Sequence, residues 1–125
     1  MGFSLGCRPL LHALADCAVL PENLRCIAFV GAAAPRHLYE RLPRRFLTEG
    51  RGRIIHVWSK NDGVLSLLYP LVQGAYPAAG AAPVNVPGIR DVEFDVGHTG
   101  YGAVASELVR VVTESHLAGR SKAPA

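Results

Sequence analysis

Residues 53–62 read Arg-Ile-Ile-His-Val-Trp-Ser-Lys-Asn-Asp, and this stretch decides the fold. Its first six residues are mostly β-branched or aromatic, which predicts a strand over residues 53–58. Polar residues follow at once and lead into Asn61-Asp62-Gly63, a strong turn signal. The stretch therefore predicts a strand that ends on polar side chains.

Two further segments predict strands, and helical segments separate the three. Residues 24–30 (Leu-Arg-Cys-Ile-Ala-Phe-Val) are apolar, and residues 91–96 (Asp-Val-Glu-Phe-Asp-Val) alternate with a period of two. Helices are predicted over residues 5–19, 36–42 and 102–116, a helix or lid-like segment over 64–72, and a loop over 75–88. This order predicts an α/β fold with about three parallel strands flanked by helices. In such sheets the chemistry gathers at the carboxyl ends of the strands.

The composition is that of a single small folded domain. The chain has 125 residues, of which 50% are hydrophobic and 18% charged, and this excludes a disordered chain. Thirteen basic and ten acidic residues give a net charge of +3, which does not indicate a nucleic-acid binder. The three cysteines contain no Cys-x-x-Cys pair, so we expect neither a disulfide framework nor a metal site, and no cofactor.

A nucleophile-elbow pattern stands at the start of the chain. Residues 2–6 read Gly-Phe-Ser-Leu-Gly, a Gly-x-Ser-x-Gly sequence directly before a predicted helix. A sharp turn there needs glycines two residues on either side of Ser4 and presents its hydroxyl at the helix N-terminus. The amide of Leu5 is then the expected oxyanion donor. The plainer interpretation is a glycine-rich turn between a strand and a helix.

Two later residues supply partners for this serine. Asp62 and His98 each follow a predicted strand, and the chain order Ser4, Asp62, His98 is that of the α/β-hydrolase triad. His98 would accept the Ser4 proton as general base, and Asp62 would orient the imidazole. Asp91 and Asp95 are rival acids, but they share the predicted strand that precedes His98.

These segments together resemble the C-terminal half of an α/β-hydrolase domain. The resemblance rests on residues 2–6, on residues 52–62 (Gly-Arg-Ile-Ile-His-Val-Trp-Ser-Lys-Asn-Asp) and on residues 87–92 (Pro-Gly-Ile-Arg-Asp-Val), followed by Gly97-His98. More narrowly, the chain resembles the lipase-like domain of the transmembrane and coiled-coil domain-containing proteins of eukaryotes, long classed as a domain of unknown function. The match covers about residues 2–115. It implies a serine-hydrolase-like site at Ser4, Asp62 and His98, and it leaves the substrate unspecified. We expect this site to act on an ester, with lipid esters among the candidate substrates.

The chain departs from that pattern at its front. A complete α/β-hydrolase places several strands before the elbow, whereas Met1 here abuts Gly2. We therefore expect the N-terminal strands, and the loop with the second oxyanion donor, to be missing. Residues 1–116 would form the C-terminal portion of the domain and residues 117–125 a disordered tail. The alternative is a truncated, inactive fragment that serves as an interaction module, or an incomplete gene product.

Weaker signals concern the substrate and the surroundings. The uncharged segment 63–89 contains Leu65, Leu68 and Tyr69, which would line an acyl pocket or belong to a buried helix. A cluster of arginines, among them Arg36, Arg41, Arg44 and Arg45, would meet an anionic membrane surface or form a solvated face. With no signal peptide and no apolar run long enough to span a membrane, a cytoplasmic or membrane-associated location is favoured over secretion.

Overall fold

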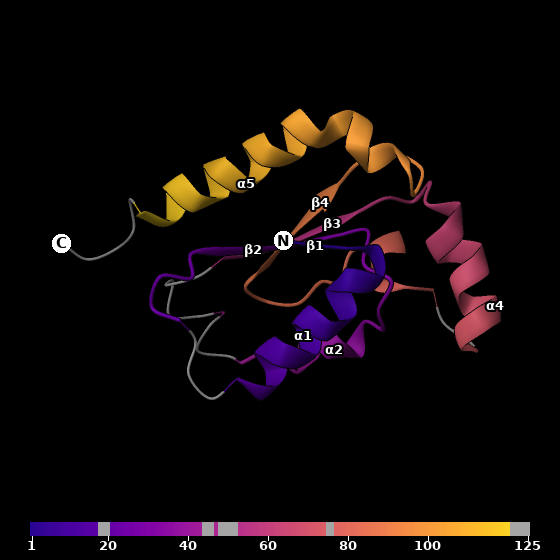
Figure 1. Cartoon of the computed structure of the whole chain (residues 1–125), viewed down its shortest axis with the longest axis horizontal. Helices are drawn as coiled ribbons and strands as arrows, with labels where there is room; N and C mark the ends of the chain where they lie inside the picture. The colour runs from indigo at the N-terminus through magenta and orange to yellow at the C-terminus, as the bar shows by residue number, and fades with distance from the viewer. Residues whose placement is uncertain (18–20, 44–46, 48–52, 75–76, 121–125) are drawn as a thin grey trace.

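The protein is a parallel β-sheet with helices on both faces. The computed structural model describes residues 1–17, 21–43, 47, 53–74 and 77–120. Its four strands are β1 (Gly2–Phe3), β2 (Cys26–Val30), β3 (Arg53–Trp58) and β4 (Ile89–Glu93), all parallel in the order β1-β2-β3-β4 (Figure 1). The predicted α/β class is confirmed. The sheet gains one strand over the three predicted, because Gly2 and Phe3 pair with Phe29 and Val30.

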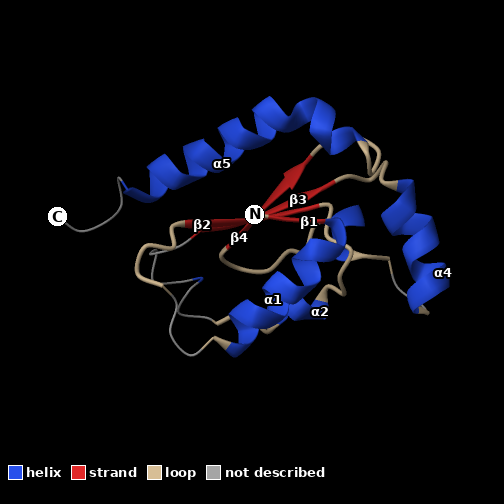
Figure 2. Ribbon diagram, viewed as in Figure 1, coloured by secondary structure: helices blue, strands red, loops and turns tan. Residues whose placement is uncertain are grey.

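The helices cover the two faces of this sheet unequally. On one side lie α1 (Cys7–Asp16) and α2 (His37–Glu40), and on the other lies the long α5 (Ala105–Arg120) (Figure 2). The π-helical turn η2 (Val64–Leu68) continues into α4 (Tyr69–Gln73), near the carboxyl ends of the strands. Short 3-10 turns are η1 (Ser4–Gly6), η3 (Ala79–Ala81) and η4 (Gly100–Val104).

The alternation of strand side chains builds one core on each face. Ile27, Phe29 and Ile54 pack beneath α1 and α2, together with Leu11 and Tyr39. The intervening residues of the same strands point the other way and pack against α5, through Ala28, Val30, Ile55, Val57, Leu108 and Val111. Both faces of β2 are therefore buried, which explains why residues 27–30 form a continuous apolar run.

Several predicted boundaries are wrong. The helix predicted over 5–19 ends at Asp16, and the strand predicted over 24–30 begins at Cys26. The strand predicted over 91–96 is β4 (Ile89–Glu93), because its partner β3 ends at Trp58, opposite Glu93. The alternating residues 94–96 form a loop past the end of β3, although Phe94 N–H still donates to the Trp58 carbonyl (2.8 Å). The helix predicted to end near residue 116 continues to Arg120, so residues 117–120 of the expected disordered tail are helical. Residues 121–125 lie outside the described residues.

His56 on β3 is a structural group of the core, as its place inside a predicted strand suggested. It is fully buried, and its Nδ1 lies 2.9 Å from the Tyr39 hydroxyl. Its Nε2 lies 3.0 Å from the carbonyl oxygens of Ala79 and Ala82. Because carbonyl oxygens only accept, Nε2 carries the proton and Tyr39 donates to Nδ1. Both ring nitrogens of the neutral imidazole thus have hydrogen-bond partners, and the bonds of Nε2 connect residues 79–82 to β3.

The free energy of unfolding is expected to fall as the pH drops below the ordinary histidine range. Burial lowers the pKa of His56 from 6.5, against smaller opposing contributions from the Ala79 and Ala82 carbonyls and Asp91. Above pH 6.5 both folded and unfolded chains hold the imidazole neutral, so this contribution to stability is fully present. Below it the unfolded chain binds a proton that the fold resists, so stability is lost. Urea unfolding between about pH 7.5 and about pH 5.5 measures the loss.

A matched pair of variants isolates the buried histidine in this experiment. His56→Gln is expected to flatten the pH dependence, whereas His12→Gln, which alters an exposed side chain on α1, should leave it unchanged. Equal pH dependence in wild type and His56→Gln would contradict the assignment.

Candidate active site

Ser4 lies at a sharp turn between β1 and η1. It has φ of +51°, a left-handed conformation that non-glycine residues rarely adopt. The turn is held because the Ser4 carbonyl accepts a hydrogen bond from Ala33 N–H (3.1 Å), in the loop after β2. Backbone strain of this kind is concentrated at functional sites, where the surrounding structure enforces it. The turn presents the half-buried Ser4 side chain at the carboxyl edge of the sheet.

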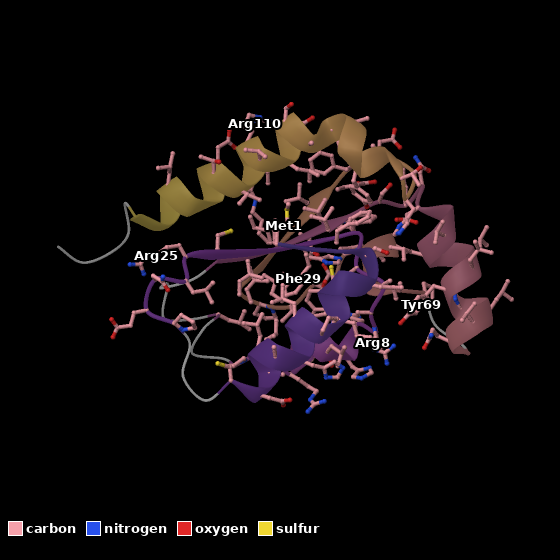
Figure 3. All side chains as sticks on the ribbon, in the orientation of Figure 1. Met1, Arg8, Arg25, Phe29, Tyr69 and Arg110 are labelled. Carbon is pink, nitrogen blue, oxygen red and sulfur yellow. The ribbon has the colours of Figure 1, made fainter. Side chains whose placement is uncertain are left out.

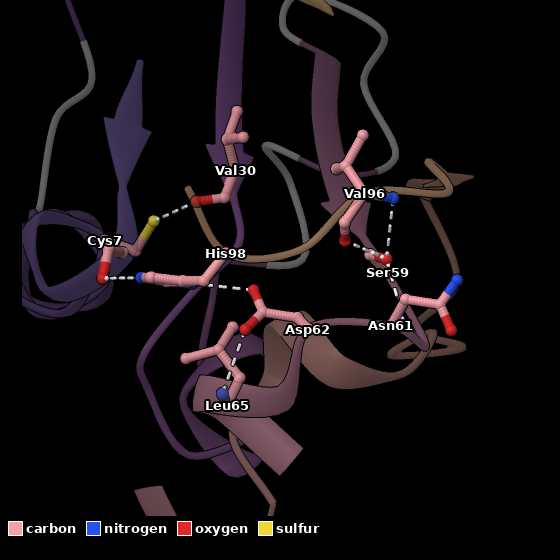
Figure 4. A network of polar contacts seen from close by, with 9 residues as sticks. Cys7, Val30, Ser59, Asn61, Asp62, Leu65, Val96 and His98 are labelled. Atoms are coloured by element: carbon pink, nitrogen blue, oxygen red, sulfur yellow. Dashed lines mark hydrogen bonds and ion pairs between the residues drawn. The ribbon is translucent and has the colours of Figure 1, made fainter. Parts of the chain in front are cut away.

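His98 lies within hydrogen-bonding distance of both Ser4 and Asp62 and connects the two. Ser4 Oγ is 2.8 Å from His98 Nε2, and His98 Nδ1 is 2.7 Å from Asp62 Oδ2. Figure 4 shows the imidazole of His98 extending across this edge, with its bond to the Asp62 carboxylate. Because a carboxylate only accepts, Nδ1 carries the proton and Nε2 is free to accept one from Ser4. The structure thus brings together the three residues singled out by their chain order.

Asp62 is fixed on both of its carboxylate oxygens. The side chain is fully buried, and while Oδ2 accepts from His98, Oδ1 accepts from the Leu65 N–H in the first turn of η2 (3.0 Å). Aspartate side chains commonly accept hydrogen bonds from backbone N–H groups in the first turn of a helix. The helix start therefore sets the direction in which the carboxylate meets the imidazole.

The loop that carries His98 is anchored by Ser59, whose role the sequence did not reveal. Ser59 is fully buried directly after β3, and its hydroxyl donates to the Val96 carbonyl (2.6 Å). The same oxygen accepts from the amides of Asn61 (3.1 Å) and Val96 (3.3 Å). Asn61 also donates to the Asp95 carboxylate across the loop. The available signal was its position, the first polar residue after a strand.

Phe3 is a second residue that sequence reasoning missed. Its ring stacks on the imidazole of His98, with centroids 5.4 Å apart and planes 23° apart. Tyr101 meets the Phe3 ring edge-on at 5.8 Å. Phe3 occupies the first variable position of Gly-x-Ser-x-Gly, so the elbow supplies both the serine and a platform for the histidine. Sequence alone gives no means of seeing that contact.

The rival acids have other partners. Asp91 accepts hydrogen bonds from the amides of Val84 (2.9 Å) and Asn85 (3.0 Å), and Asp95 accepts from Asn61. Both are thereby engaged in holding loops. Asp62 is the acid that contacts His98.

The other predicted site residues lie on η1 and on the segment formed by η2 and α4. Leu5 follows Ser4 in the first turn of η1, where backbone amides lack helical acceptors, and its side chain is exposed. Leu65 is buried with Ala33 and Ala78, Leu68 is exposed, and Tyr69 packs partly buried against the Leu65 cluster. Leu65 is thus a core residue, whereas Leu68 is open to solvent and Tyr69 lies between the two extremes.

The arginine cluster is described only in part. Arg36 and Arg41 are exposed on either side of α2, whereas Arg44 and Arg45 lie outside the described residues. Within the described ranges, no helix has the length and apolar character needed to cross a membrane.

Cys7 lies beneath the elbow. Its thiol is buried and points at the Val30 carbonyl (3.8 Å), and burial raises its pKa to about 11. The thiol is therefore protonated at neutral pH and serves as a packing group.

The two glycines of the elbow differ in the space around them. A Cβ added to Gly2 would lie 3.2 Å from Cys7 Cα and 3.3 Å from its Sγ, whereas one added to Gly6 would meet nothing within 4 Å. The expectation that both glycines are sterically required holds for Gly2 and is wrong for Gly6.

Gly2→Ala is expected to destabilise the protein by about 1 kcal/mol, because it crowds α1 against the elbow strand in a packed core. Gly6→Ala is the matched control. Gly6 has helical dihedral angles and open space around its Cα, so alanine there should be neutral or stabilising by up to about 1 kcal/mol. Chemical unfolding of both variants measures the difference, and equal destabilisation of the two would contradict the packing described.

Comparison with known proteins gives little beyond this geometry. No model of a known protein family matches the sequence, and no solved structure matches it. The chain is similar to a protein of Schizosaccharomyces pombe described as "Uncharacterized membrane protein C6F6.13c", with 32% identity over 99 residues. That similarity covers 78% of this chain and 17% of the yeast protein, so the chain spans a small part of its relative's length.

Proposed function

We propose that the protein is a serine hydrolase that cleaves carboxylic esters through Ser4, His98 and Asp62. The observation that carries the proposal is the continuous pair of contacts from Ser4 Oγ to His98 Nε2 (2.8 Å) and from His98 Nδ1 to Asp62 Oδ2 (2.7 Å). The positive φ of Ser4 at a strand-to-helix turn supports it independently. A nucleophile, a base and a group that orients the base are the parts such a reaction requires.

The proposed reaction proceeds in two halves. Ser4 Oγ attacks the ester carbon while its proton passes to His98 Nε2, and the C–O bond then breaks as the alcohol departs with that proton. Water next attacks the acyl-Ser4 ester, again giving a proton to His98, which returns it to Ser4 Oγ as the acid leaves. Asp62 stabilises the imidazolium in both halves, and the Leu5 amide is the proposed oxyanion donor. Beyond the substrate, the proposed reaction needs only protein groups and water, with no cofactor.

A lipid ester is the substrate class we favour. Apolar side chains are exposed beside the nucleophile, with Phe3 48% and Leu5 66% accessible, and Leu68 of η2 is 56% accessible. Exposed apolar side chains of this kind would contact the acyl chain of a lipid and shield it from water. The description of the Schizosaccharomyces pombe relative as a membrane protein is compatible with a lipid substrate.

A fluorophosphonate probe tests the catalytic proposal. Wild type should be labelled covalently, because an activated serine attacks the phosphorus and expels fluoride, and Ser4→Ala should not. Ser106→Ala, an exposed serine on α5, is the matched control and should label like wild type. Failure of folded wild type to label, or equal labelling of Ser4→Ala, would refute the proposal.

A non-catalytic interaction module is the second candidate. It is supported by β1, which lies at an edge of the sheet with β2 as its neighbour, and by the exposed Phe3 in that strand. Edge strands can pair with another chain. The labelling experiment separates the candidates, because a module that acts only by binding does not activate Ser4.

A further inference from the structure

A cleft of about 670 Å³ lies between α4 and the helices α1 and α2. Residues of all three helices line it, together with the turn that contains Ala79 and Val84, whereas Ser4, Asp62 and His98 do not. The volume is in the usual range for small-molecule sites. Nothing in the proposed hydrolysis uses this cleft.

The cleft carries cationic side chains without acidic ones. These are Arg8 and Arg36; His37 also lines the cleft, and the lining residues include no aspartate or glutamate. Within the part of the chain that the structure describes, none of the three forms an ion pair. Arg36 Nε donates to the Val84 carbonyl (2.9 Å), which fixes the guanidinium and leaves its terminal nitrogens for a ligand.

Tyr69 supplies the second, independent observation. Its hydroxyl oxygen is buried and has no hydrogen-bond partner in the described residues, although the residue lines the cleft. Figure 3 shows Tyr69 on the side of α4 that faces α1, with Arg8 nearby. A buried hydroxyl without a partner is costly and uncommon. Because the hydroxyl oxygen is closed off from solvent, the Tyr69 side chain must turn toward the cleft before an acceptor oxygen there can satisfy it.

We propose that this cleft binds the anionic oxygens, phosphate or carboxylate, of a small amphiphile. Arg8, Arg36 and the Tyr69 hydroxyl donate to those oxygens, and the ligand's apolar part lies on Ala78, Ala79 and Val84. The inference stands on the cleft's own residues and is independent of the proposed hydrolase function.

Calorimetric titration of the Ser4→Ala protein with decyl phosphate tests the proposal without interference from hydrolysis. Arg8→Gln and Arg36→Gln should each weaken binding by about tenfold, since each removes charge-assisted hydrogen bonds. Arg25→Gln is the matched control, because Arg25 is exposed and does not line the cleft. Tyr69→Phe should weaken binding without lowering Tm, because its hydroxyl has no partner to lose.

Further titrations distinguish the sources of the anion. Binding of decyl phosphate that exceeds binding of inorganic phosphate indicates a soluble amphiphile. Binding confined to phosphatidylcholine vesicles that contain phosphatidic acid, and lost in Arg36→Gln, indicates a headgroup in a membrane; either result supports the anion site. Absence of binding to all these probes, or binding that Arg8→Gln and Arg36→Gln leave unchanged, overturns the proposal.

Discussion

Ser4→Gly is expected to abolish ester hydrolysis, with kcat falling by about 10⁶, while the protein remains folded. Removal of the hydroxyl eliminates the nucleophile, so turnover of p-nitrophenyl butyrate should drop to the level of Ser4→Ala. Stability should separate these two variants. Ser4 has φ of +51°, which costs a residue with a Cβ about 1–2 kcal/mol and glycine almost nothing.

The comparison with Ser4→Ala isolates the backbone strain. Alanine keeps the Cβ and the strain, whereas glycine relieves it at an entropic cost of about 0.5–1 kcal/mol in the unfolded chain. The free energy of unfolding of Ser4→Gly, measured with urea, should therefore equal that of Ser4→Ala or exceed it by up to about 1 kcal/mol. If Ser4→Gly retains activity, Ser4 is not the nucleophile. If Ser4→Gly is clearly less stable than Ser4→Ala, the backbone at residue 4 is not strained.

The sheet could be predicted where local chemistry and burial agree. Residues 53–58 are β-branched and aromatic and lie between two strands, so prediction and structure coincide there. The residues of β1 could not be predicted, because a strand of two residues has no periodicity and depends on pairing with Phe29 and Val30. The strand predicted over residues 91–96 failed past residue 93 for the converse reason, since the alternation continues where the partner strand has ended.

The proximity of Ser4, Asp62 and His98 could be predicted from their order and position, but the residues that support them could not. In a parallel sheet every strand ends at the same edge, so Asp62 and His98, which follow two predicted strands, are brought to one place. Ser4 was singled out by the Gly-x-Ser-x-Gly pattern and not by a predicted strand. Ser59 and Phe3 act through contacts 37 and 95 residues away in sequence, with Val96 and His98. Side-chain contacts of that separation follow from the fold and not from a local pattern.

Asp62→Asn is expected to lower kcat by about 10⁴ with little effect on stability. The amide oxygen can still accept from Leu65 N–H, so the start of η2 is kept. The amide nitrogen then faces His98 Nδ1 and donates to it, which moves the imidazole proton to Nε2. A protonated Nε2 donates to Ser4 Oγ, 2.8 Å away, and cannot accept its proton. Steady-state hydrolysis and the rate of fluorophosphonate labelling should fall together.

Asp95→Asn is the matched control for this change of tautomer. Asp95 precedes His98 by three residues and is exposed, but its partner is Asn61 and not the imidazole. Its replacement removes the same charge near the site while the Nδ1 proton stays in place, so kcat should change by less than about threefold, as expected for an exposed group. Equal losses in the two variants would mean that negative charge near His98, and not the hydrogen bond from Nδ1 to Asp62, supports the reaction. A loss confined to Asp62→Asn assigns that role to the tautomer.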